Sequence, residues 1–462
     1  MINRYGVLAG PRTVRDRLGK LWISSDIDRT GFHYVQALRR IRWRLRALLC
    51  FAMVWACKGE AQQDWLHVCT DAGAGGYEAF PDVCRLADGR LMAVFYAGYG
   101  HISLPNESLP NGGRISLCTS ADEGQTWTAA RTLFDGPYDD RDPSVTQLRD
   151  GRLVCTFFIL KPTGETSYTG LGTFAVTSAD RGVTWDTVPQ QISADYYCSS
   201  PVRELADGRL ILGLYKQTST DAWGAVTISE NGGTTWSAPV IIPTGGLRYE
   251  AETDVIELKD GALFAALRGQ KHSGWSVSKD GGKSWTTAEL FGFPGHCHYL
   301  HRAPGDIILM AHRLPATSLH VSLDEGQTWS TNIVVDTVTG AYPSMVTLKD
   351  SSTLIVYYGE GTGSSLRAKR FRVTPAGFQW LSPASGWPTV RAYLNANGGR
   401  WTNTADWADG ILPGPGEIAD LSLATGELML TGDVTVGEIH YNPVFSGTTN
   451  RLTILSDTGA QQ

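Results

Sequence analysis

Acidic, basic and phenolic side chains recur at a fixed distance from a series of Asp-Gly turns in this sequence. The positions eight residues before and eight residues after each turn hold carboxylates, an arginine, histidines and several tyrosines. Carboxylates and phenols can transfer protons or attack a substrate, and arginine binds anions through two parallel hydrogen bonds. Charged side chains are rarely buried unless they are paired or functional, so we expect these positions to form a ligand site and not a packed core.

The turns belong to a repeated segment that reads P-x-V-x-x-L-x-D-G-x-L and precedes an apolar, strand-like run. Its copies are Pro81–Leu91, Pro143–Leu153, Pro201–Leu210, Thr253–Leu263 and Pro343–Leu354, with a looser one at Tyr299–Leu309. Eight residues before the turns lie Phe80, Asp142, Ser199, Glu252 and Tyr342, with His296 if Pro304-Gly305 replaces the fifth turn. Eight residues after them lie Tyr96, Phe158, Tyr215, Arg268, His312 and Tyr358.

A second pattern, S-x-D-x-G-x-x-W, follows most of these segments. Its copies are Ser120–Trp127, Ser178–Trp185, Ser278–Trp285, Ser322–Trp329 and, with Asn for Asp, Ser229–Trp236. The successive tryptophans are 58, 51, 49 and 44 positions apart, a period that indicates repeated supersecondary units. Asp or Asn can bind nearby backbone amides and Gly adopts conformations that other residues resist, so we expect these Asp-boxes to be structural turns.

Six such units predict an all-β fold, a six-bladed β-propeller over residues 62–380. The sixth unit has no Asp-box, and Asp64–Cys69 could supply its missing outer strand and close the ring. The inner strands of a propeller run side by side around the axis. Residues at equivalent positions would therefore form a ring at one mouth.

These features resemble the bacterial sialidase (neuraminidase) superfamily over about residues 64–375. The Asp-boxes carry the resemblance in fold, and the spacing from Glu252 through its Asp-Gly turn to Arg268 matches that family's fourth blade. The segment Tyr342-Pro-Ser-Met-Val-Thr-Leu-Lys-Asp350 matches its sixth. The resemblance implies a retaining exo-α-sialidase that releases terminal sialic acid. In it Tyr342 would be the nucleophile, Glu252 its base and Arg268 a ligand of the substrate carboxylate.

The first blade departs from the family pattern. An arginine is expected two residues before the blade-one proline, where this sequence has Ala79. The family's acid/base Asp is also absent between Tyr96 and Ser120, where Glu107 and His101 are the obvious substitutes.

Other positions could compensate for these losses. Arg313 is an imperfect counterpart of the family's third arginine, and Glu360 is a displaced counterpart of the blade-six glutamate. In blade two, Arg141 lies where blade one lost its arginine, and Asp140 or Asp142 could donate the proton. Substrate-binding candidates are therefore Arg141, Arg268, Arg313, His296, Tyr96 and Glu360, and the acid/base is open among Glu107, Asp140 and Asp142.

Two alternatives keep the fold. One is a hydrolase or lyase that acts on another acidic sugar, such as a uronate in a polysaccharide, and the other is a non-catalytic glycan-binding propeller. The segment Gly295–His301 contains three histidines, but strand alternation would place them on different faces, so we expect neither a metal nor another cofactor. The expected partners are sialylated or other acidic glycans.

The ends of the chain differ from the propeller. A basic stretch, Arg39–Arg46, and an apolar run too short to span a membrane, Ala47–Cys57, predict a signal peptide within residues 1–61 and a secreted, periplasmic or cell-surface protein. Residues 1–60 hold 12 of the 40 Lys and Arg and 4 of the 46 Asp and Glu. The remainder is therefore net acidic, which argues against nucleic-acid binding.

Its six cysteines show no C-x-x-C spacing and are expected mostly in the core. Residues 381–462 predict an incomplete β-solenoid or small β-sandwich that could attach the protein to a surface.

Overall fold

The computed structural model describes most of the predicted propeller and parts of the C-terminal region. The described residues are 65–218, 220–246, 249–269, 273–338, 340–360 and 364–381, followed by 390–395, 397–407, 410–414, 418–421, 428–429 and 438–440. All of them belong to the second of the two units into which the chain divides, Gln63–Gln462. The expected leader lies outside the described residues. None of the described segments forms a helix with the length and apolarity that crossing a membrane would require.

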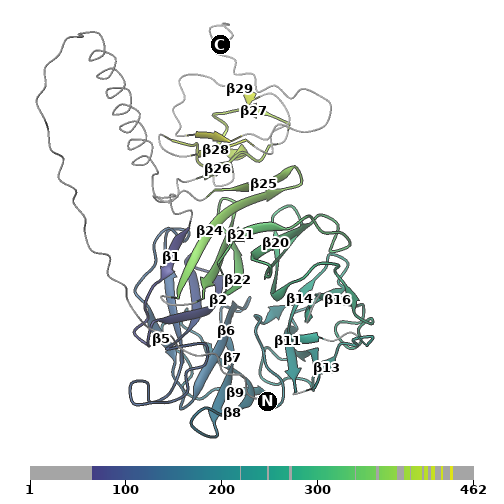
Figure 1. Ribbon diagram of the computed structural model, residues 1–462. Coiled ribbons are helices and arrows are strands. Elements are labelled where there is room, and N and C mark those ends of the chain that lie inside the picture. Colours follow the sequence, from purple (N-terminus) through teal and green to yellow (C-terminus); the bar gives the residue numbers. More distant parts are fainter. Residues whose placement is uncertain are drawn as a thin grey trace, which may run out of the picture. The chain divides into compact units, whose positions relative to one another are not determined.

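Six antiparallel sheets form the blades of a β-propeller, and each of the first five is built from consecutive strands (Figure 1). The first five blades are β2–β5 (Tyr77–Arg85, Leu91–Gly98, Arg114–Ser120, Arg131–Phe134), β6–β9 (Asp139–Gln147, Leu153–Pro162, Tyr168–Ser178, Gln190–Ser193), β10–β13 (Arg203–Glu204, Leu210–Gln217, Ala222–Ser229, Val240–Ile241), β14–β17 (Tyr249–Glu257, Leu263–Gly269, Gly274–Ser278, Glu289–Leu290) and β18–β21 (His296–Ala303, Ile307–Arg313, Thr317–Ser322, Ile333–Asp336). The six-bladed architecture expected from the repeats is confirmed.

The sixth blade is completed by a strand from the other end of the propeller. It contains β22 (Gly340–Thr347), β23 (Thr353–Gly359) and β24 (Ser365–Thr374), and β1 (Leu66–Cys69) pairs antiparallel with the first half of β24. The short β25 (Gly377–Trp380) pairs with its second half. The ring closes where the amide of Val83 on β2 donates a 2.8 Å hydrogen bond to Ser344 Oγ on β22. Apolar cores fill the spaces between neighbouring blades.

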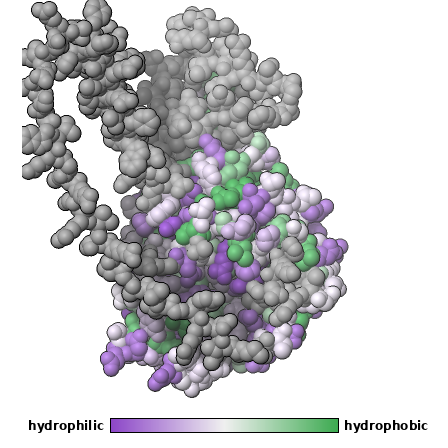
Figure 2. Space-filling view, in the orientation of Figure 1, coloured by the Kyte–Doolittle hydropathy of each residue, from purple (hydrophilic) through white to green (hydrophobic). Residues whose placement is uncertain are grey.

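The Asp-boxes are structural turns, as expected. In the first one, Ser120 Oγ accepts a 2.8 Å hydrogen bond from the amide of Gly124, and Asp122 accepts one of 2.9 Å from the amide of Thr126. Glu123 and Gly124 have φ values of 59° and 86°, which let the chain reverse within four residues. The Trp127 ring packs against the adjacent apolar core. Figure 2 shows hydrophilic and hydrophobic residues interspersed over the visible face of the propeller.

A β-bulge near the start of the inner strand positions the ring of residues at the mouth. In blade one, Ala79 pairs with Tyr96 and the register then shifts by one residue before Asp82. The residue in the bulge has positive φ in four blades: Phe80 (52°), Asp142 (49°), Cys297 (55°) and Tyr342 (37°). Bulges commonly redirect a side chain next to a functional site. Glu252 occupies the same position in β14, because Ala251 pairs with Arg268 directly before it.

Blade five corrects one expectation. Counting from Pro304 assigned His296 and His312 to the ring, but Ala303 pairs with Ile307, so the centre of that turn is Gly305. The ring positions therefore move by one residue. Cys297 takes the place that was expected for His296, and Arg313, which pairs with His296, takes the place that was expected for His312.

The described strands of the C-terminal region pair in parallel. β26 (Val390–Ala392), β28 (Ile418–Asp420) and β30 (Glu438–His440) form one sheet, and β27 (Gly399–Arg400) pairs with β29 (Leu428–Met429). A one-turn 3₁₀ helix, Thr404–Asp406, lies between β27 and β28 in the sequence. Parallel pairing of successive short strands is the pattern of a solenoid and not of an antiparallel sandwich. Tyr393, Trp401 and Trp407 are buried in its core.

Candidate active site

A phenol, a carboxylate and a guanidinium from two blades meet at one mouth of the propeller. The hydroxyl of Tyr342 on β22 donates a 2.7 Å hydrogen bond to Glu252 Oε1 on β14. Arg268 Nη1 on β15 donates to both oxygens of Glu252, at 2.7 and 2.9 Å. The Glu252 side chain is 6% exposed. The structure therefore assembles the three residues that the sequence comparison singled out into one hydrogen-bonded cluster.

The electrostatics of this cluster favour a neutral phenol beside a charged pair. Burial, together with the nearby Cys297 and Glu252, raises the pKa of Tyr342 well above its usual value. The phenol is therefore protonated at rest and donates its proton toward Glu252. Although burial opposes the charged form, Glu252 raises the pKa of Arg268, so the guanidinium stays cationic. This arrangement allows Glu252 to accept the phenolic proton if Tyr342 attacks a substrate.

Arg313 extends the positive charge to the other side of the tyrosine. Its guanidinium lies 5.3 Å from the centre of the Tyr342 ring, and its Nη1 donates a 3.4 Å hydrogen bond to the carbonyl of Gly340. The neighbouring His296 is half-buried. Burial and the charge of Arg268 lower the pKa of His296 to about 4, which keeps its ring neutral above that pH. Arg268 and Arg313 thus provide two cations that could hold an anion beside Tyr342.

Arg141 lies under aromatic rings and is not open to solvent. The residue is 4% exposed, and its guanidinium carbon lies 5.1 Å from the ring centre of Phe80 and 5.5 Å from that of Tyr96. Its Nη2 donates a 3.4 Å hydrogen bond to Asp142. Arg141 therefore occupies the register in which blade one has Ala79, but its charge is already paired and covered.

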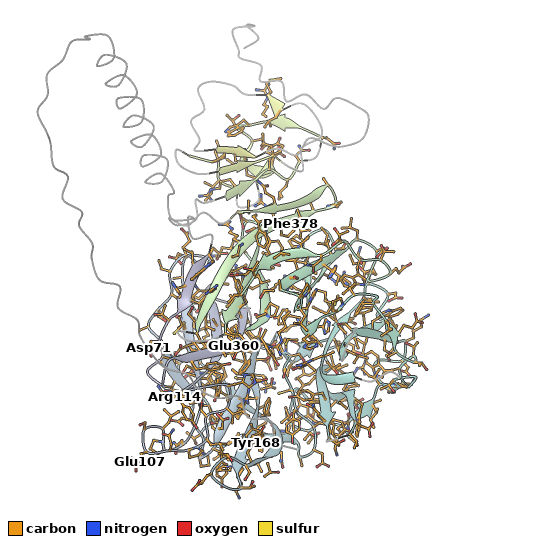
Figure 3. All side chains as sticks on the ribbon, in the orientation of Figure 1. Asp71, Glu107, Arg114, Tyr168, Glu360 and Phe378 are labelled. Carbon is orange, nitrogen blue, oxygen red and sulfur yellow. The ribbon has the colours of Figure 1, made fainter. Side chains whose placement is uncertain are left out.

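The structure separates the three carboxylates that were open as proton donors. Asp142 lines a small cavity together with Tyr342 and Cys297, and burial raises its pKa to about 6. Asp140, which lies within β6, accepts a 2.6 Å hydrogen bond from the amide of Gly136 and does not line this cavity. Glu107 is exposed on the loop between β3 and β4 and lies at the outer edge of the propeller in Figure 3. Only Asp142 is brought to the tyrosine.

Glu360 and Tyr96 have different surroundings. Glu360 follows β23 and accepts 2.8 Å hydrogen bonds from the hydroxyls of Tyr77 and Tyr358. His101 Nδ1 lies 3.8 Å from Glu360 Oε1. Tyr96 is fully buried, and its hydroxyl donates to Asp139 at 2.7 Å, so it supports the fold around the mouth and does not face a ligand.

Two residues at the mouth were missed in the sequence. Tyr77 lies three residues before the first ring position, and nothing in the repeat marks it. Cys297 would have been found if the fifth turn had been centred on Gly305, as the strand pairing requires.

The histidines of Gly295–His301 face different surroundings, as strand alternation suggested. His298 Nε2 contacts Ser273 Oγ at 2.7 Å, and His301 Nε2 contacts Thr347 Oγ1 at 2.9 Å. Among the described residues, no group of three or more His, Cys, Asp or Glu side chains is arranged to hold a metal ion. The six cysteines of the described propeller are all free thiols.

Comparison with known proteins agrees with this architecture. The family model described as a BNR repeat-like domain matches residues 113–357, more than half of the chain. A sialidase from Micromonospora viridifaciens is 25% identical over 351 residues, which is 64% of this chain and 53% of that protein. The chain thus spans about half the length of this relative.

Two solved structures share the fold at low identity. A protein of unknown function from Dyadobacter fermentans has a TM-score of 0.58 and 20% identity, over 68% of this chain and 99% of that one. The Hadza microbial sialidase Hz136 has a TM-score of 0.53 and 17% identity, over 66% of this chain and 68% of that one. With the six blades, the Asp-boxes and the match to more than half of its length, the chain belongs to the BNR repeat-like family of sialidase-superfamily propellers.

Proposed function

We propose that this protein is a secreted exo-acting glycoside hydrolase that releases terminal sialic acid with retention of configuration. The observation that carries the proposal is the 2.7 Å hydrogen bond from the Tyr342 hydroxyl to Glu252 beside two arginines. The sialidase relative supports the same class of reaction. The basic and apolar segments of residues 39–57 support export of the chain.

The substrate explains why a phenol would serve as the nucleophile. The anomeric carbon of a sialoside bears a carboxylate, which would repel an attacking carboxylate, and sialidases are the glycosidases that use tyrosine instead. An isolated phenol is a weak nucleophile near neutral pH because its ordinary pKa is about 10. Glu252 removes its proton during attack, and Arg268 with Arg313 binds the sugar carboxylate and holds the anomeric carbon against Tyr342.

The reaction proceeds in two displacements. In the first, the Tyr342 oxygen bonds to the anomeric carbon, its proton moves to Glu252, and the bond to the leaving oxygen breaks as that oxygen receives a proton from an acid. In the second, water attacks the same carbon and gives up a proton to the conjugate base, while Tyr342 leaves and regains its proton from Glu252. The net change is hydrolysis of the glycosidic bond with two inversions.

A uronate-bearing glycan is the second candidate substrate, and the state of Arg141 favours it. The blade-one arginine is replaced by Ala79, and Arg141 is covered by Phe80 and Tyr96. The carboxylate would then be held by Arg268 and Arg313 and not by three arginines. A carboxylate site with two arginines would also accept other acidic sugars.

Hydrolysis of a fluorogenic aryl α-sialoside by the full chain, with Tyr342→Phe beside it, tests the proposal. We expect turnover by the wild-type chain and loss of turnover in the variant, since the phenylalanine ring has no attacking oxygen. Turnover of an aryl uronide alone would select the second candidate. Binding of either sugar without turnover would indicate a glycan-binding propeller.

A further inference from the structure

The hydrogen-bonded cluster of Tyr342, Glu252 and Arg268 holds no second carboxyl group to protonate the leaving oxygen. In an exo-acting enzyme the departing part of the glycan extends toward solvent, so the donor must lie at the open rim of the site. The Asp142 side chain lines the cavity and is only 6% exposed. Asp140 is fully buried and accepts a hydrogen bond from the amide of Gly136, and Glu107 lies at the outer edge of the propeller (Figure 3). None of these three carboxylates satisfies the requirement.

His101 lies at the rim, one aromatic ring away from the nucleophile. It follows β3 in blade one, and its side chain is 53% exposed. Its ring centre lies 5.3 Å from that of Phe80, and the Phe80 ring also contacts Tyr342, with 4.8 Å between the ring centres. Phe80 thus separates the imidazole from the phenol at the mouth where the substrate would bind.

The loop that carries His101 is fixed to the body of the propeller. Ser103 Oγ accepts hydrogen bonds from the amides of Tyr99 (2.9 Å) and Gly100 (3.2 Å), which closes a tight turn around His101. The amide of Ser103 donates to Asp139 at 3.3 Å, and the Ser103 residue is fully buried. The imidazole is therefore held at a defined place even though it faces solvent.

One ring nitrogen of His101 is oriented by the protein. Nδ1 lies 3.2 Å from the Tyr77 hydroxyl and 3.8 Å from the Glu360 carboxylate. Glu360 is itself held by the hydroxyls of Tyr77 and Tyr358. Within the described part of the chain, Nε2 of His101 has no hydrogen-bond partner and is free to meet a substrate. An imidazole oriented through one nitrogen and active through the other is the usual arrangement of a catalytic histidine.

The charges around His101 come from four elements. Burial and the cations Arg141 on β6 and Arg313 on β19 lower its pKa, while Glu360 after β23 opposes them. Tyr77 on β2 is the remaining titratable contact, and burial raises the pKa of its phenol, so it stays neutral. The His101 imidazolium is consequently a stronger acid than free histidine, which suits proton donation in mildly acidic solution.

We propose that His101 is the catalytic acid and base of the hydrolysis and that Glu360 is its positioning residue. This inference rests on the proposed function. In the first displacement His101 Nε2 gives its proton to the leaving oxygen as the glycosidic bond breaks. In the second, the neutral imidazole accepts a proton from the attacking water. After one turnover the imidazole of His101 is protonated again, as it was at the start.

The test compares two leaving groups. A methylumbelliferyl α-sialoside expels a stable phenolate without protonation, whereas sialyllactose expels a sugar hydroxyl that needs a proton. For His101→Ala we expect kcat/KM on sialyllactose to fall about 10²–10⁴-fold, the usual contribution of a general acid, and to change far less on the aryl substrate. Azide should accelerate aryl turnover by the variant, because it attacks the tyrosyl intermediate without a base.

Each alternative has its own result. Equal losses on both substrates, in a variant with an unchanged melting temperature, would overturn the role of His101. So would a selective loss on sialyllactose in Glu107→Gln or Asp142→Asn with His101→Ala unaffected. If the wild-type chain hydrolyses neither sialoside, the proposed function fails and the inference fails with it. If the wild-type chain is active and the His101→Ala variant is equally active, only the inference fails.

A pH profile isolates the part played by Glu360. Replacing it by Gln removes a negative charge near the imidazole, so the alkaline limb of kcat/KM on sialyllactose should move to lower pH. A role confined to packing would lower the rate without moving the limb. An unmoved limb would overturn the positioning role.

Discussion

The Tyr342 hydroxyl and the Glu252 carboxylate form a 2.7 Å hydrogen bond across 90 residues of sequence and one intervening blade. No local turn of the chain brings the two residues together. Both are placed by the same bulge position of their inner strands, so the contact exists only when blades four, five and six stand in their native order. The hydrogen bond between the candidate nucleophile and base therefore requires a correctly assembled propeller.

Glu252→Gln should abolish most turnover and spare the fold. The amide keeps the shape and can still accept a hydrogen bond from Tyr342, but it cannot take up the phenolic proton. We expect kcat to fall about 10²–10⁴-fold. Steady-state kinetics on an aryl sialoside, with sialic acid affinity measured by calorimetry, will check this. Retained kcat would show that another group activates the tyrosine.

Arg268→Lys and Arg313→Lys should weaken binding of the substrate carboxylate. A charged hydrogen bond contributes about 1.5–3 kcal/mol, so each loss corresponds to roughly a 10- to 150-fold higher KM. The methyl ester of the same sialoside is the substrate control, because it has no carboxylate to lose. Arg152→Lys, at an exposed pair with Asp150, is the matched protein control and should behave as wild type. Equal effects on the free sialoside and on its methyl ester would argue against binding of the substrate carboxylate by these arginines.

Asp142 should make stability depend on pH between about 4 and 6. Its folded pKa is raised to about 6, chiefly by burial, from an ordinary value of 3.8. In this window the folded protein holds a proton that the unfolded chain has released, so this group's contribution to the free energy of unfolding falls as pH rises. The full effect is at most about 3 kcal/mol.

The comparison with Asp142→Asn isolates that contribution. The asparagine variant should gain stability relative to wild type as pH rises from 4 to 7. Thermal or urea unfolding at several pH values will measure the difference. A constant difference over this range would contradict the raised pKa.

The closing strand β1 should contribute to the stability of the propeller. Val68 is 4% exposed in the core between blades six and one, whereas the adjacent His67 is exposed. Val68→Ser removes apolar burial and introduces a buried hydroxyl, which should cost about 2–3 kcal/mol. His67→Ser should change stability by less than about 0.5 kcal/mol. Urea unfolding of the two variants provides the measurement, and equal values would indicate that β1 is dispensable.

The fold could be predicted from the sequence because each repeat is marked by the residues that its turns require. Asp-Gly turns and Asp-boxes require specific residues at fixed spacing, and the strands between them follow from the apolar pattern. Counting from those turns also located Glu252, Arg268 and Tyr342. The one error of counting, His296 for Cys297, arose where Pro-Gly replaced Asp-Gly and moved the centre of the turn.

The rest of the site depends on contacts that periodicity does not encode. Arg141 has the expected register, but its cover of Phe80 and Tyr96 depends on packing between blades. The position of His101 depends on a loop held by Asp139 from the next blade. Such loops carry no repeat, so their side chains could be named as candidates but not placed.

The strand that closes the ring also sets the order of events during folding. Leu66 pairs with Ala368, so the first strand of the propeller waits for nearly the whole domain to be synthesised before it finds its partner. Such long-range pairing is slow, because loop closure costs entropy before any contact compensates it. Until then β1 is an unpaired strand, which invites association with other chains. The emerging chain therefore has a long interval in which a chaperone that covers strand edges would protect it.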